Sequence, residues 1–142
     1  MKDKSFLKPV LVIPCSGIGK VHGLLTREAT YLVTDEMASG QTDTMCLALL
    51  VKGDSEALDA VKSQACITVD GCTKACAEKN VKIAGGNPAQ IVQVTEALKK
   101  HPGAKPGSPT ELTDEGWMIA REIARGIADS AKRLSDSREG VR

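Results

Sequence analysis

The sequence predicts an α/β protein in which a mainly parallel sheet of about four strands is flanked by helices. Short aliphatic runs typical of buried strands alternate with segments whose apolar residues recur at helical spacing. The length of 142 residues suits one domain, which we expect to span residues 1–134, with a polar tail over 135–142. For the strand order we expect the flavodoxin-like arrangement 2-1-3-4, which is common in doubly wound sheets.

A glycine-rich turn separates the first strand from the first helix. Residues 7–13 form a mostly aliphatic run that ends at Pro14, as expected for a strand buried on both faces. Val21, Leu24, Leu25 and Leu32 then predict an amphipathic helix over residues 18–37. Ser16 is the expected N-cap of this helix, and Gly40 is the expected stop signal.

The second strand can have two lengths. Residues 43–51 are largely apolar, and a strand that continues to Val51 would leave Cys46 roughly 16 Å short of the carboxyl edge. If the strand stops near Cys46, the thiol lies at that edge, and residues 47–53 form a connection. Either version leads to a helix over residues 55–63.

The second half of the chain repeats the alternation of strand and helix and closes with a long helix. We expect a strand at 66–69, which ends at Asp70 and Gly71, then a helix at 73–83 and a strand at 90–94. An irregular proline-rich segment follows at 101–109. The final helix is expected from about Thr113, with an apolar stripe of Ile119, Ile123 and Ile127.

Composition excludes several function classes. The formal net charge is +1, so a nucleic-acid surface, which needs clustered Lys and Arg, is not expected. The apolar runs are too short for a membrane span or a secretory leader, and we expect a cytoplasmic protein without a membrane partner. The sequence leaves a homo-oligomer open. We find no catalytic-triad order, paired carboxylate motif or H-E-x-x-H motif, which favours a protein that is not an enzyme.

The glycine-rich turn at residues 15–23 follows a strand and opens a helix, as phosphate-binding loops do. It lacks the first glycine and the hydroxyl residue of a Walker A loop, since Pro14 and Val21 occupy those positions. His22 stands where the dinucleotide fingerprint needs glycine. Ser16, Lys20, His22 and, further along, Lys74 remain candidates for holding an anion. An ordinary tight turn between strand and helix is the alternative interpretation.

Five cysteines are the unusual feature of the composition, and their odd number does not indicate a disulfide framework. In the order 2-1-3, Cys15 ends the first strand and Cys72 follows the third, and Cys46 reaches the same edge if the second strand is short. Cys72 and Cys76 are four residues apart, so we expect both on one face of the helix at 73–83. Three neighbouring connections would then bring four sulfurs to the edge where open α/β sheets hold ligands.

Cys66 does not belong to this group. It begins the third strand, roughly 20 Å from Cys72, and should be an inert buried thiol. The other cysteines can also be interpreted as small core residues. That alternative is strongest for Cys46, which has apolar neighbours, and weaker for Cys72 and Cys76, which lie in a polar turn.

Three segments resemble the DGC-domain family of proposed zinc-binding proteins. They are Pro14-Cys15-Ser16-Gly17, Met45-Cys46-Leu47-Ala48 and Asp70-Gly71-Cys72-Thr73-Lys74-Ala75-Cys76, in the family's order. The resemblance covers about residues 10–84, with a weaker match over the final helix. It implies that Cys15, Cys46, Cys72 and Cys76 bind a zinc ion, and it leaves Cys66 outside the pattern. We therefore expect the short second strand, because a four-thiolate site needs Cys46 at the edge.

Two other functions use the same cysteines. A thiol-redox or sulfur-carrier enzyme could act through Cys15 and the pair Cys72 and Cys76, because helix N-termini and nearby lysines activate thiols. Four cysteines can also hold an iron–sulfur cluster. In a zinc site, Lys20 and Lys74 would offset the negative charge of four thiolates, and His22 could replace Cys46 as fourth ligand.

Overall fold

The predicted four-stranded parallel sheet is present in the structure. The computed structural model describes the backbone of residues 8–140 and the side chains of residues 8–136. The strands are β1 (Val10–Pro14), β2 (Thr42–Thr44), β3 (Cys66–Asp70) and β4 (Gln90–Gln93). All are parallel and lie in the order β2-β1-β3-β4, which confirms the expected topology.

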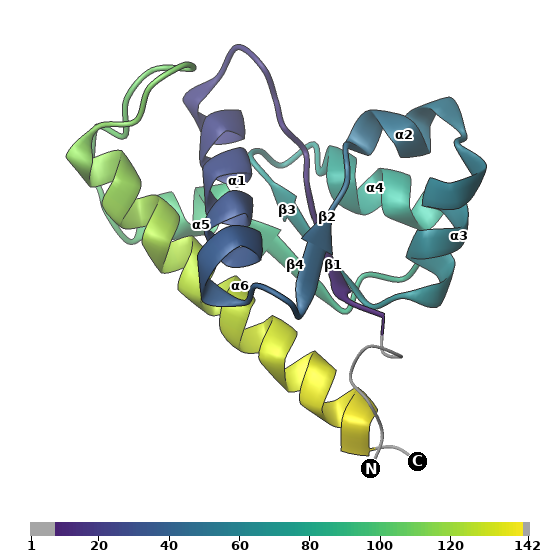
Figure 1. The fold of residues 1–142 in the computed structure, drawn as a ribbon. Helices are drawn as coiled ribbons and strands as arrows, with labels where there is room; N and C mark the ends of the chain where they lie inside the picture. Colours follow the sequence, from purple (N-terminus) through teal and green to yellow (C-terminus); the bar gives the residue numbers. More distant parts are fainter. Residues whose placement is uncertain (1–7, 141–142) are drawn as a thin grey trace.

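Helices cover both faces of the sheet, which makes a three-layer fold (Figure 1). They are α1 (Val21–Leu32), α2 (Leu47–Lys52), α3 (Ser55–Ser63), α4 (Cys76–Ile83), α5 (Val94–Lys99) and α6 (Asp114–Gly140), and a π-helical turn, η2 (Val33–Met37), extends α1. Figure 1 shows α1 and α6 packed on one face of the sheet, while α2, α3 and α4 lie together on the other.

The two central strands are buried on both faces, as their aliphatic sequences predict. Successive side chains of a strand point to opposite faces. Val10 and Val12 of β1 accordingly pack with α1 and α6, and Leu11 and Ile13 pack with α2, α3 and α4. The carboxyl edge of the sheet therefore lies between two separate apolar layers, and the connections that leave it are held from both sides.

Several helix boundaries differ from the predictions. The first helix begins at Val21 and not at residue 18, and η2 carries it to Met37 as expected. Residues 47–53 do not form an irregular connection, because Leu47–Lys52 is helix α2, which ends at Gly53 in the left-handed conformation (φ 86°). Helix α5 follows β4 directly and was not predicted.

The final helix is the longest element and begins within one residue of its predicted start. The Thr113 hydroxyl accepts a hydrogen bond from the Gly116 N–H at 3.1 Å, which caps the first turn. Ile119, Ile123 and Ile127 are buried against the layer that contains α1, as the apolar stripe predicts. The helix continues to Gly140 and so includes residues 135–140 of the expected tail. Within the described residues, none of the helices combines the length and apolar character needed to span a bilayer.

Candidate metal centre

Cys15 directly follows β1, and its sulfur is in contact with the connection that leaves β3. The half-buried Cys15 Sγ accepts a hydrogen bond from the Gly71 N–H at 3.3 Å. The strand register produces this contact, because Pro14 is paired with Val69, so that Cys15 and the residues after β3 emerge side by side. This contact brings the Cys15 thiol to the connection that carries Cys72 and Cys76.

The buried hydroxyl of Thr26 in α1 holds the turn after Cys15. Thr26 Oγ1 donates to the Gly23 carbonyl at 2.6 Å, accepts the Ser16 N–H at 3.3 Å, and lies 4.0 Å from Cys15 Sγ. The prediction that Ser16 is the N-cap of α1 is wrong. The backbone of Ser16 is left-handed (φ 55°), and Lys20 occupies the N-cap position without a side-chain cap bond. No sequence pattern indicated Thr26, because a threonine within an amphipathic helix has no distinguishing signal.

Cys46 lies beyond the end of a short β2, as we expected. The strand ends at Thr44, which is level with Val12, so Cys46 follows two residues later near the height of Pro14. Its side chain is exposed, and Cys46 is the residue immediately before α2. The short strand therefore brings this thiol to the carboxyl edge of the sheet.

Cys72 and Cys76 do not share a helical face, and this prediction is wrong. Helix α4 begins at Cys76, and Cys72 lies in the preceding turn, where its carbonyl accepts the Ala75 N–H at 3.2 Å. The left-handed conformation of Ala75 (φ 54°) separates this turn from the helix. Cys72 is half-buried and Cys76 is exposed, so the turn presents its two thiols in different environments.

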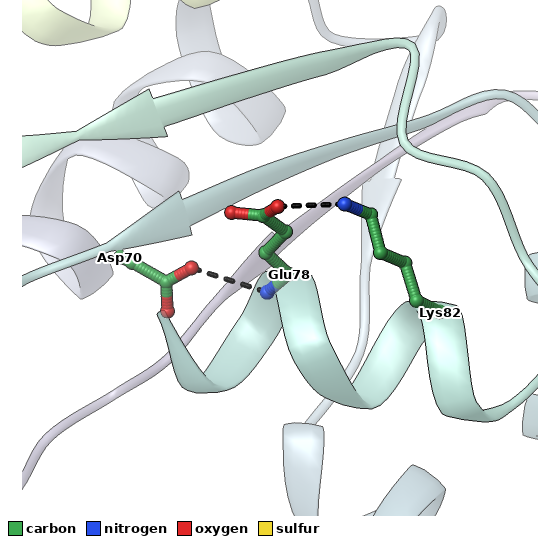
Figure 2. A network of polar contacts seen from close by, with 3 residues as sticks. All are labelled: Asp70, Glu78 and Lys82. Atoms are coloured by element: carbon green, nitrogen blue, oxygen red, sulfur yellow. Dashed lines mark hydrogen bonds and ion pairs between the residues drawn. The ribbon is translucent and has the colours of Figure 1, made fainter. Parts of the chain in front are cut away.

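Asp70 fixes the start of α4. Its buried carboxylate accepts the N–H groups of Ala77 at 2.7 Å and Glu78 at 3.1 Å. Figure 2 shows the bond to Glu78 and the ion pair, 2.7 Å long, that Glu78 forms with Lys82 one turn later. Burial raises the pKa of the Asp70 carboxyl, although the two N–H bonds oppose the shift. Asp70 therefore attaches the first turn of α4 to the end of β3 through two side-chain hydrogen bonds.

We expect Asp70→Ala to lower the free energy of unfolding by about 2–3 kcal/mol, because it leaves two buried N–H groups without a partner. Asp54→Ala is the matched control: Asp54 caps α3 through one bond, from the Ala57 N–H at 3.0 Å, and its loss should cost about 1 kcal/mol. Urea denaturation of both variants measures the difference. Equal losses would show that Asp70 is no more than an ordinary cap.

Three of the four candidate cysteines border one apolar layer. Cys15 packs against the cluster that contains Leu47 and Ala77, which are the residues immediately after Cys46 and Cys76. Cys15 also contacts Gly71, the residue before Cys72. The four thiols therefore lie on three neighbouring connections at one edge. Within the part of the chain that the structure describes, however, no three Cys, His, Asp or Glu side chains lie close enough to hold a metal ion.

Cys66 lies apart from this group, as predicted. It is fully buried at the start of β3, opposite Leu11, and its sulfur contacts the carbonyls of Val61 and Gln64 at 3.8 and 3.5 Å. Burial raises the pKa of the Cys66 thiol to about 11, from an ordinary value of 9.0. A buried thiol with a raised pKa is expected to react poorly at neutral pH.

The raised pKa predicts a specific loss of stability in alkali. The folded state retains the Cys66 proton where the unfolded state loses it, so the stabilisation is complete below pH 9.0 and disappears as the pH rises through about 11. The shift corresponds to about 3 kcal/mol. Urea denaturation in the presence of chelator gives the free energy of unfolding of the parent and of Cys66→Ala. The difference between the two should shrink by roughly this amount as the pH rises from 9.0 to above 11. Parallel pH profiles would exclude the effect.

The remaining predicted site residues fall into two groups. Lys20 and His22 line a cavity together with Cys72, so the structure brings these three together. His22 is also held by its neighbour, since a Cβ atom on Gly71 would lie 3.0 Å from the His22 carbonyl carbon. Lys74 is exposed in the turn between the two cysteines, and the half-buried Ser16 follows Cys15. These two do not line the cavity.

Among the comparisons with known proteins, only the comparison with protein families gives a match. No curated protein and no solved structure matches the chain. The sequence model of the DGC domain matches residues 11–115, which is well over half of the chain and includes all five cysteines. The match ends at the second residue of α6, so the expected similarity over the final helix is not part of it. The chain therefore belongs to the DGC domain family.

Proposed function

We propose that this protein binds one zinc ion through the thiolates of Cys15, Cys46, Cys72 and Cys76. The carrying observation is the 3.3 Å contact between Cys15 Sγ and the Gly71 N–H, which joins the connection after β1 to the turn that holds Cys72 and Cys76. Membership of the DGC domain family is consistent with a metal-binding role. Four sulfurs arranged tetrahedrally at about 2.3 Å are a preferred ligand set of zinc.

The donor residues suit such a site in type, since all four are free cysteines. Cys46 and Cys76 are exposed at the ends of connections, and zinc binding would draw them toward the half-buried Cys15 and Cys72. Zinc with four thiolates has a formal charge of −2. The Gly71 N–H and the exposed Lys74, which lies in the turn between Cys72 and Cys76, would offset part of that charge.

A four-thiolate site leaves no coordination position for water. The proposed role is therefore structural, sensory or metal-handling rather than hydrolytic. In this role the chain's own residues act by position: Asp70 anchors the turn that holds Cys72, and Thr26 anchors the turn that follows Cys15.

Elemental analysis of protein purified without chelator or immobilised nickel tests the proposal. We expect about one zinc per chain, released together with an increase in reactive thiols when a chelator is added. Brown protein that contains iron would indicate an iron–sulfur cluster instead. Metal-free protein whose Cys15 or Cys72 reacts rapidly with alkylating reagents would favour the thiol enzyme.

A further inference from the structure

The carboxyl edge of the sheet also carries a cavity that a four-cysteine site does not need. Its volume is about 510 Å³, and its walls include Lys20, His22, Cys72, Thr95, Gly107 and Pro109. Small-molecule sites commonly measure about 300–1,000 Å³. The cavity lies above β1 and β3, whose following helices, α1 and α4, cover opposite faces of the sheet. This is the switch point where open α/β sheets bind ligands.

The walls of the cavity combine positive charge with apolar surface. Lys20 and His22 approach it from α1, Thr95 adds a hydroxyl group, and none of the lining residues is acidic. Val21 and Pro109 provide the apolar part. An ammonium group without a carboxylate partner in the same cavity favours an anionic ligand. The volume exceeds what a bare oxyanion fills, so the apolar wall has space for an organic group.

Backbone contacts hold the walls in place. Gly107 pairs with Leu112 in an antiparallel bridge. No side chain fits at position 107, because its φ is 127° and a Cβ atom would lie 2.3 Å from the Glu111 carbonyl oxygen. The Ser108 N–H donates to the same carbonyl at 2.8 Å. On the opposite wall, Gly71 packs against His22. A preformed cavity binds a ligand without the cost of ordering its walls.

We propose that this cavity binds a small organic anion, with a phosphate or carboxylate group beside Lys20 and His22 and the carbon skeleton against Val21 and Pro109. The inference goes beyond the zinc proposal, because Lys20, His22, Val21 and Pro109, and not the four thiolates, would hold this ligand. The two sites meet at Cys72, so the bound anion would lie next to the metal-binding turn.

Titration of ¹⁵N-labelled full-length protein with glycerol 3-phosphate, succinate and inorganic phosphate, at constant ionic strength, tests the proposal. We expect saturable shifts of the amides of Gly19, His22 and Gly107 with at least one of the two organic anions. Whichever organic anion saturates these shifts identifies the acidic group. Absence of saturation with both would overturn the proposal, and inorganic phosphate binding as tightly as either would overturn the role of the apolar wall.

Lys20→Gln should weaken the affinity about tenfold, because it removes the charge-assisted contact. Lys52→Gln is the matched control: this exposed lysine ends α2 on the other face of the sheet and should leave the affinity unchanged. Equal affinities of the two variants would contradict the assignment of Lys20. The titration is made with zinc-loaded and with chelated protein. Zinc-loaded protein without anion binding refutes only this inference, whereas anion binding by protein that never holds zinc refutes only the metal proposal.

Discussion

Cys72→Ser is expected to abolish zinc retention, and Cys46→Ser is expected to weaken it about as strongly. Serine lacks the thiolate, and a tetrahedral site with three sulfurs binds zinc far less tightly than one with four. Elemental analysis after dialysis against a weak chelator gives the bound zinc per chain. Thermal unfolding of the same samples should show lower midpoints for both variants, because zinc stabilises only the folded state.

Cys66→Ser is the control for this series. Its thiol is buried at the opposite end of β3, so the variant should retain about one zinc per chain even though it loses some stability. Loss of zinc in Cys66→Ser would refute the assignment of the site. If Cys46→Ser retains its zinc, the ligand set is three thiolates with His22 or water as the fourth ligand. An open, catalytic coordination position would then return to consideration.

The fold was predictable because the elements that define it have strong local signals. β1 and β3 are aliphatic runs with clear ends, and the stripe of Ile119, Ile123 and Ile127 in α6 matches the helical period. The position of Cys46 was also predictable, but only by combining the ambiguous length of β2 with the need for a thiol at the sheet edge.

The errors occur where a tertiary contact determines a boundary, or where a segment is too short for its periodicity to be recognised. Residues 73–75 fit a helix by composition, yet the carboxylate of Asp70 takes the N–H groups of Ala77 and Glu78 and sets the start of α4 at Cys76. The run of Leu47–Lys52 was too short for its period to distinguish helix from connection. The cavity wall at Gly107 depends on a bridge to Leu112 that no local pattern specifies.

The turn after Cys15 depends on one glycine in a helix, which provides the second large expected effect. Gly23 lies in the first turn of α1 and is buried, and the turn after Cys15 folds directly over it. A Cβ atom on Gly23 would lie 1.8 Å from the carbonyl oxygen of Gly17 and 2.6 Å from its nitrogen. Backbone atoms cannot yield as the end of a flexible side chain can, so any side chain at position 23 must displace the turn.

Gly23→Ala is therefore expected to destabilise the protein by roughly 3 kcal/mol or more, as overpacking against a fixed backbone does. The sign is the reverse of the usual result, because alanine in a helix interior is normally better than glycine by about 1 kcal/mol. Gly126→Ala provides the control. Gly126 lies in α6 with nothing within 4 Å of its Cβ position, and its replacement should stabilise the fold by about 1 kcal/mol. Urea denaturation of the two variants should give changes of opposite sign in the free energy of unfolding.

Gly23→Ala should also lose zinc, since its displaced turn carries Cys15 away from Gly71. Stabilisation by both alanines would show that the turn over α1 is not closely packed and that the position of Cys15 does not depend on it.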